Sequence, residues 1–127
     1  QIDTMKKTIT ILEDDLDIRD ICTLIFESEG FVVHGYGTVA NFSRDILPTD
    51  IFLLDVRLPD GNGIDVCRML KADKRFSKIP IIIMSAHINP LLHEQNYGED
   101  LFITKPFNLN YMLEQVELLI DNHRDNL

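Results

Sequence analysis

Carboxylates, a hydroxyl and an amino group each stand at or just after the end of a short apolar run in this sequence. Carboxylates that lie close together repel one another, so such a cluster needs a divalent cation or a cationic side chain to neutralise it. Oxygen ligands of this kind suit Mg²⁺, which keeps several waters and leaves a coordination position for a phosphate oxygen. The residues concerned are Glu13, Asp14, Asp15, Asp55, Ser85 and Lys105.

Each of these residues also has an ordinary structural interpretation. An acidic group after a strand is commonly a solvated loop residue or a helix N-cap, and a serine such as Ser85 is common in turns. Lys105 and Pro106 together are equally typical of a segment that simply ends a strand. The coincidence of all these groups at the same ends of successive predicted strands favours an anionic site over the separate interpretations.

The elements that must position these groups alternate between β-branched apolar runs and segments whose apolar residues recur at helical spacing. Thr38 and Asn108 are predicted to cap helices, and Gly30 and Pro48 to end them. The alternation predicts βα units with right-handed crossovers, and hence an α/β three-layer sandwich around a five-stranded parallel sheet. Strands are expected over residues 8–12, 31–36, 51–54, 79–84 and 101–103, with a short fourth helix around residues 91–97.

Length and composition predict one domain over residues 1–127, with residues 1–7 as a flexible N-terminal extension. The 12 basic and 21 acidic residues give a formal charge of −9, which repels nucleic acid and anionic membranes. No apolar run approaches the length of a membrane span, and the N-terminus lacks the pattern of a signal peptide. We therefore expect a cytoplasmic protein with no nucleic-acid or membrane partner. Cys22 and Cys67 fall in amphipathic patterns and are expected to be buried hydrophobic residues.

The stretches ILEDD, LLDVRLPDGNGID, IIIMSA and LFITKPF resemble, in this order, the motifs of the receiver domain of two-component response regulators. The resemblance covers nearly the whole chain. It implies the flavodoxin-like receiver fold, in which the strands are ordered 2-1-3-4-5.

The resemblance also implies a role for each acidic residue. Asp55 matches the phosphoacceptor, and Asp14 matches a direct ligand of Mg²⁺. Glu13 matches a residue that acts on the metal mainly through water, and the backbone carbonyl of Arg57 matches the remaining protein ligand. Asp15 falls one place beyond this acidic pair.

Further residues match the part of the family's site that handles the phosphoryl group. Ser85 corresponds to the hydroxyl that follows this group, Lys105 to its cationic partner, and Pro106 to a cis-proline. Phe102 corresponds to the aromatic switch residue, with a core aromatic as the alternative. An aspartyl phosphate adds about −1.5 to −2 charges and three strong hydrogen-bond acceptors, which these groups would bind.

The sequence departs from the family pattern after Ser85. The interval from Ser85 to Gly98 is about two residues shorter than usual and contains Pro90, which predicts a short or distorted fourth helix. In the receiver family the fourth helix contributes to the face that binds partners. The departure therefore bears on partner binding more than on the phosphorylation chemistry. Arg57 and His87 are candidates for tuning the site, with exposed loop positions as the alternative.

The resulting prediction is a signalling module that accepts phosphate on Asp55 from a sensor histidine kinase or a histidine phosphotransfer protein. It is not expected to be an enzyme except toward its own phosphorylation and dephosphorylation. An effector domain or a second copy would bind through the fourth helix, fifth strand and fifth helix.

Three other classes of protein share parts of this pattern. An aspartyl-phosphate phosphatase or phosphotransferase would carry a second acid two residues beyond Asp55, where Arg57 stands. A flavin-binding protein would need a glycine-rich or hydroxyl-rich phosphate loop in place of the acidic stretch EDDLD. A pseudo-receiver that acts without phosphorylation is disfavoured by the intact acidic set.

Overall fold

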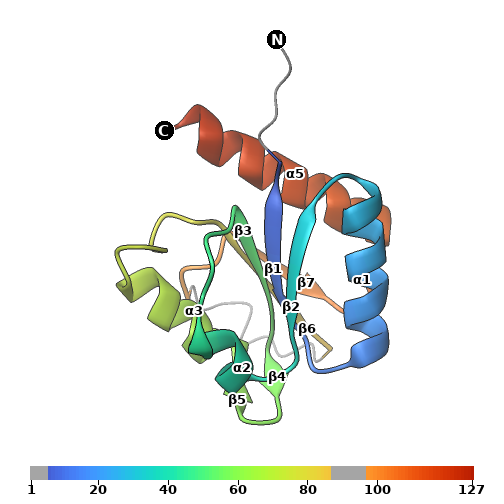
Figure 1. The fold of residues 1–127 in the computed structure, drawn as a ribbon, viewed down its shortest axis with the longest axis vertical. Helices are drawn as coiled ribbons and strands as arrows, with labels where there is room; N and C mark the ends of the chain where they lie inside the picture. Colours follow the sequence, from blue (N-terminus) through green and yellow to red (C-terminus); the bar gives the residue numbers. More distant parts are fainter. Residues whose placement is uncertain (1–5, 87–96) are drawn as a thin grey trace.

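A parallel sheet of five strands forms the centre of the molecule, and its order is β2-β1-β3-β6-β7 (Figure 1). The computed structural model describes residues 6–86 and 97–127. Because β4 (Arg57–Leu58) and β5 (Gly61–Asn62) belong to a separate hairpin, this order is the predicted 2-1-3-4-5 arrangement. The strands are β1 (Thr8–Leu12), β2 (Val32–Tyr36), β3 (Ile51–Asp55), β6 (Ile81–Ser85) and β7 (Leu101–Thr104).

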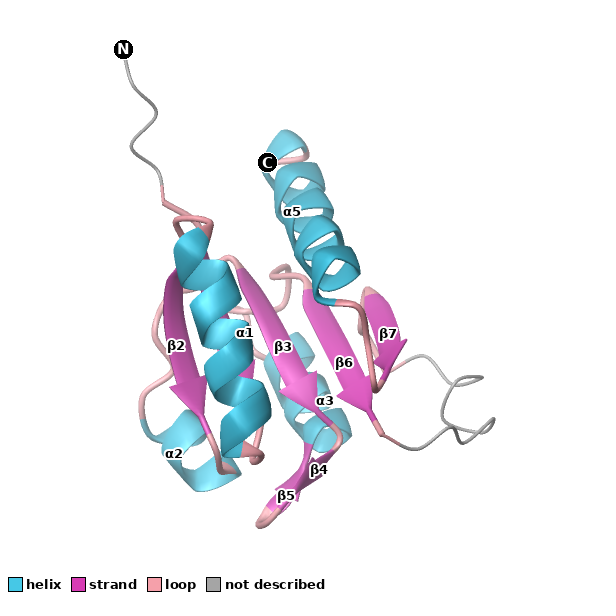
Figure 2. Cartoon of the chain, turned by 90° about the vertical axis from the view of Figure 1, so that its right-hand side faces the viewer, coloured by secondary structure: helices cyan, strands magenta, loops and turns pink. Residues whose placement is uncertain are grey.

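Helices cover both faces of this sheet, as Figure 2 shows. One buried cluster joins the sheet to α1 and α5, and a second cluster joins it to α2 and α3. All residues of β3 and β6 are buried, which explains why their sequences are continuous apolar runs and not alternating ones. The three-layer prediction is confirmed. The helices are α1 (Leu16–Ser28), α2 (Val39–Arg44), α3 (Gly63–Ala72) and α5 (Leu109–Asp125).

The helix boundaries follow from capping residues. Thr38 and Asn108 accept N–H bonds at the starts of α2 and α5, as predicted. Asp15 and Asn62 do the same for α1 and α3. Gly30 has a φ of 86° directly after the end of α1, a conformation in which glycine meets no steric penalty.

A small antiparallel hairpin follows β3 and is absent from the strands expected from the sequence. It consists of β4 (Arg57–Leu58) and β5 (Gly61–Asn62). At its turn the Asp60 carboxylate accepts the N–H groups of Val39 and Ala40 at 2.8 and 2.9 Å. The hairpin is therefore attached to the start of α2, a long-range contact that local turn chemistry cannot reveal.

Two predicted boundaries differ from those in the structure. The fourth strand begins at Ile81 and not at residue 79, and Pro80, which lacks an N–H, contributes only its carbonyl to Phe52. Lys7 is already bound to the fold, because its carbonyl accepts the Val32 N–H at 2.9 Å. The fourth helix expected around residues 91–97, with Pro90 before it, lies outside the described residues apart from its last position. None of the helices described is both long and apolar enough to cross a membrane.

Candidate functional site

The predicted site residues meet at the carboxyl edge of the sheet. Parallel pairing places Leu12 beside Leu54 and Asp55 beside Met84, so the residues that follow β1 and end β3 and β6 share one edge. A cavity of about 270 Å³ opens there. It is lined by Glu13, Asp14, Asp15, Ile18, Asp55, Arg57, Ser85, Ala86 and Lys105.

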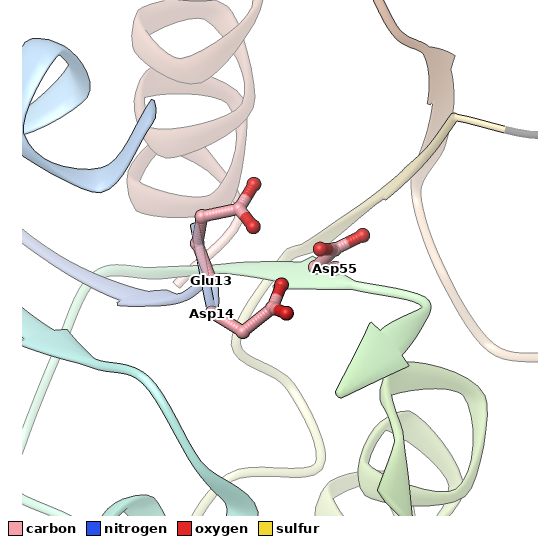
Figure 3. A group of neighbouring side chains, drawn as sticks. All are labelled: Glu13, Asp14 and Asp55. Carbon is pink, nitrogen blue, oxygen red and sulfur yellow. The ribbon is translucent and has the colours of Figure 1, made fainter. Parts of the chain in front are cut away.

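Three of the carboxylates in this cavity lie close together (Figure 3). One oxygen from each of Glu13, Asp14 and Asp55 lies within 4.8 Å of the others. Glu13 and Asp55 are buried, whereas Asp14 is exposed to solvent. An oxygen-only donor set with one open side fits a hard divalent cation that keeps several of its waters.

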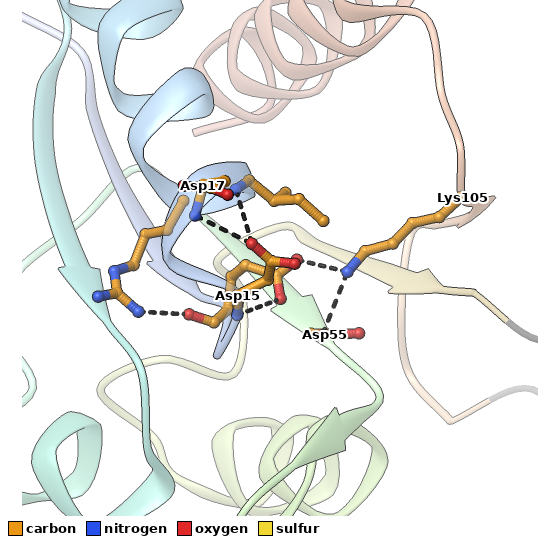
Figure 4. Close-up of polar contacts among 7 residues, drawn as sticks. Asp15, Asp17, Asp55 and Lys105 are labelled. Atoms are coloured by element: carbon orange, nitrogen blue, oxygen red, sulfur yellow. Dashed lines mark hydrogen bonds and ion pairs between the residues drawn. The ribbon is translucent and has the colours of Figure 1, made fainter.

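Lys105 is the cationic member of the cluster. Its Nζ donates to Oε1 of Glu13 and, at 3.2 Å, to Oδ2 of Asp55, as the dashed lines in Figure 4 show for Asp55. Its backbone N–H donates to the carbonyl of Ser85 at 2.7 Å, which ties the end of β7 to the end of β6. The peptide bond between Lys105 and Pro106 is cis, as the resemblance implied.

One ammonium group does not fully balance these carboxylates. Burial, followed by the hydrogen-bonding interaction with Asp55, raises the pKa of Glu13 to about 7, and the bond from Lys105 only partly opposes this. Burial also acts to lower the pKa of Lys105, but its contacts with Glu13 and Asp55 outweigh burial, so that pKa is raised. Lys105 therefore stays positively charged, and the acidic cluster retains excess negative charge that a divalent cation would neutralise.

Asp15 differs from its two acidic neighbours. Its carboxylate accepts the N–H groups of Asp17 and Ile18 at 2.9 and 3.1 Å, so it is the N-cap of α1 (Figure 4). Its own N–H donates to Oε2 of Glu13 at 3.1 Å. The capping role was one of the interpretations open from the sequence, and it agrees with a register in which Asp15 falls outside the acidic pair.

Gly63 packs against the backbone of Asp55 and was not identified from the sequence as a site residue. Its N–H donates to the carbonyl of Val56 at 2.9 Å. A Cβ atom on Gly63 would lie 2.1 Å from the carbonyl oxygen of Asp55, so no other residue fits without moving that strand end. The only signal in the sequence was the glycine itself, at the start of a helix.

The remaining site candidates have different positions. Ser85 ends β6, is buried and lines the cavity. Phe102 lies within β7, is partly buried and packs against the cluster on the α2 and α3 side of the sheet. Arg57 begins β4, is exposed and borders the cavity. His87 lies outside the described residues.

Fold and cavity together define a doubly wound α/β domain with an acidic cavity at the carboxyl ends of its parallel strands, the edge at which such sheets bind ligands. The family profile of the response regulator receiver domain matches residues 9–117. The chain belongs to this family and is a receiver domain of two-component signal transduction.

Similar proteins agree with this assignment. The DNA-binding response regulator MtrA of Mycobacterium tuberculosis is 35% identical over 98% of this chain and 55% of its own length. A sensor protein from Polaromonas superposes with a TM-score of 0.84 at 27% identity, over 94% of this chain and 99% of that one. A CheY-like receiver domain protein from Methanospirillum hungatei gives 0.83 at 26% identity, over 97% of this chain and 100% of that one. The chain spans about half the length of the curated MtrA relatives that it matches.

Proposed function

We propose that Asp55 accepts a phosphoryl group in a site that holds Mg²⁺. The observation that carries the proposal is the convergence of Glu13, Asp14 and Asp55 within 4.8 Å, beside the ammonium of Lys105. Asp14, Asp55 and the backbone carbonyl of Arg57 would hold the ion, with Glu13 acting through water. When bound, the ion neutralises negative charge and orients phosphate oxygens.

The chain's own residues account for the rest of the chemistry. A carboxylate oxygen of Asp55 attacks the phosphorus, and the bond from phosphorus to the donor breaks, with its electron pair leaving on the donor. Lys105, already 3.2 Å from Oδ2 of Asp55, stabilises the negative charge on the transferred oxygens. The product is an aspartyl phosphate, and the protein acts only on itself, in both forming and hydrolysing this group.

The phosphorylated state would be read out through Ser85 and Phe102. Ser85 lines the cavity, and its hydroxyl would donate to a phosphoryl oxygen and draw the end of β6 inward. Phe102 is only partly buried on the neighbouring strand, so its ring can become more buried when the end of β6 moves. Arg57, at the rim of the cavity, is placed to tune access to it.

The partners follow from the receiver family. The phosphate donor would be a sensor histidine kinase or a histidine phosphotransfer protein of the cytoplasm. MtrA is described as a DNA-binding response regulator, and this chain matches only about half of it. An effector domain or a second receiver copy, bound through β7, α5 and the fourth helix that the sequence predicts, is therefore the output that we propose.

Phosphorylation of the purified domain by acetyl phosphate tests the proposal. We expect incorporation of one phosphoryl group that requires Mg²⁺, is lost with a chelator, and is abolished in Asp55→Asn because an amide oxygen is a poor nucleophile. A pseudo-receiver belongs to the same family but would give no incorporation. Undiminished labelling of Asp55→Asn would contradict the assignment of the acceptor.

A further inference from the structure

Arg19 of α1 reaches back to the acidic end of β1. Its Nη1 donates to the main-chain carbonyl of Glu13 at 2.7 Å. That carbonyl belongs to the peptide that joins Glu13 to Asp14, so the guanidinium holds the segment of backbone from which both acidic side chains project. On the other side, the N–H of Glu13 donates to the carbonyl of Tyr36 at 2.9 Å.

Two glycines near the end of β2 lie beside the Arg19 side chain. A Cβ atom on Gly37 would lie 2.7 Å from Nη1 of Arg19, and one on Gly35 would lie 3.4 Å from its Cδ. Among the described residues, positive φ angles are confined to Gly30 and Gly98. Gly35 and Gly37 are therefore not required by backbone conformation, and a glycine inside a strand weakens it. At Gly37 a side chain would force the guanidinium of Arg19 to move, whereas at Gly35 a Cβ atom would make only an ordinary contact with Arg19.

We propose that Arg19 is a positioning residue for the metal site: it fixes the Glu13–Asp14 peptide and thereby the directions of the two carboxylates. The inference rests on the proposed function, since it takes Mg²⁺ as the ligand of Asp14 and, through water, of Glu13. Arg19 itself makes its bond to a carbonyl and acts on the metal only through these residues.

The sign of the effect separates this role from simple electrostatics. Removing a positive charge near an acidic cluster should by itself strengthen binding of a cation. Loss of a positioning bond should instead weaken Mg²⁺ binding, because part of the binding free energy must then be used to order the two carboxylates. Arg19→Ala therefore gives opposite results under the two explanations.

The test is a titration of the purified domain with Mg²⁺ alone, followed by amide NMR shifts. We expect Arg19→Ala to raise the dissociation constant roughly tenfold, the lower end of the range for groups that orient metal ligands. Arg19→Lys should recover part of the loss, since an ammonium can still donate to the carbonyl. Arg124→Ala is the matched control: it removes the same charge from a residue paired with Asp50 at the opposite edge of the sheet, and should leave the constant unchanged.

Gly37→Ala provides a second test in which Arg19 is retained. The added methyl group would displace the guanidinium, and the dissociation constant should rise in the same direction. An unchanged or lower constant in Arg19→Ala or in Gly37→Ala would overturn the inference. If the parent domain bound no Mg²⁺ at all, the proposed function would fail with it; binding by the parent and equally by both variants would reject the inference alone.

Discussion

At the level of single residues, Glu13 shows that the metal-free acidic cluster is electrostatically unfavourable. It is fully buried, and its contacts are the ammonium of Lys105, the Asp15 N–H and a second carboxylate, that of Asp55. Its pKa is raised from 4.5 to about 7, so in the absence of a metal the folded protein binds a proton there more tightly than the unfolded chain does. The repulsion between these carboxylates is what a bound divalent cation would relieve.

This raised pKa predicts how the stability of the metal-free domain depends on pH. The stabilisation due to the proton on Glu13 is fully present below about pH 4.5 and is lost as the pH rises to about 7, so the free energy of unfolding should fall over this interval. The loss should be on the order of 1 to 3 kcal/mol. Urea unfolding at several pH values would measure it, with Glu13→Gln as the control in which the slope disappears. Saturating Mg²⁺ should also reduce the slope, and an unchanged slope in Glu13→Gln would assign it to another group.

The neighbouring acids Asp14 and Asp15 should respond differently to substitution. Asp14→Ala should weaken Mg²⁺ binding and hence phosphorylation, because Asp14 contributes an oxygen to the cluster. Asp15→Ala should leave Mg²⁺ binding largely intact and instead lower stability by about 1 kcal/mol, since the carboxylate caps α1. Mg²⁺ titration and urea unfolding of both variants separate these effects. Equal losses of Mg²⁺ affinity would mean that the acidic register is misassigned.

At the level of elements, the close contact between the end of β3 and the start of α3 is what presents Asp55. Gly63 begins α3 against the backbone of Asp55, and the hairpin of β4 and β5 fills the interval between them. The short approach holds the end of β3 at the rim of the cavity without a long connecting loop. This close contact requires a residue without a side chain at position 63.

Gly63→Ala should therefore be strongly destabilising. Its Cβ would lie 2.1 Å from the Asp55 carbonyl oxygen, so strand and helix must separate, at a cost of about 2 to 4 kcal/mol. Gly61→Ala is the control, because its Cβ would meet only a methyl group of Val39 at 3.1 Å. Urea unfolding should show a much smaller loss for Gly61→Ala. Similar stability of the two variants would contradict the close packing at this junction.

The elements were predictable where a local pattern decides them. The buried runs that became β1, β3 and β6, and the caps Thr38 and Asn108, are properties of neighbouring residues. The hairpin of β4 and β5 was missed because Asp60 acts on α2, a contact between segments distant in sequence. Arg19 was missed for the same reason: a single arginine on a helix is ordinarily exposed, and only the folded chain brings it to the Glu13 carbonyl.

At the level of the whole molecule, the sequence predicted that the site candidates would lie together, whereas the switch role of Phe102 came only from the family resemblance and stays a prediction. The resemblance covered nearly the whole chain, and the parallel sheet then brought Glu13, Asp55 and Lys105 together as expected. A second conformational state leaves no signature in the sequence pattern. Phe102, partly buried on β7, is the residue through which such a state can be tested.

Phe102→Ala should leave phosphorylation of Asp55 largely intact and weaken the response of the output face. Fuller burial of an aromatic ring is worth on the order of 1 to 3 kcal/mol, which biases a two-state equilibrium by roughly ten- to a hundredfold. NMR shift changes induced by beryllofluoride would measure the response along β7 and α5. The same changes in the variant and the parent would leave Phe102 as a core residue only.

The most direct test of the account is to locate the phosphoryl group after treatment with acetyl phosphate and Mg²⁺. Reduction with borohydride converts an aspartyl phosphate to homoserine, and peptide mass spectrometry then identifies the residue. We expect conversion at Asp55 alone, which is buried beside Lys105, with Asp14 and Asp15 unchanged. Conversion at another carboxylate, or none at Asp55 under conditions in which the intact protein gains a phosphoryl group, would contradict it.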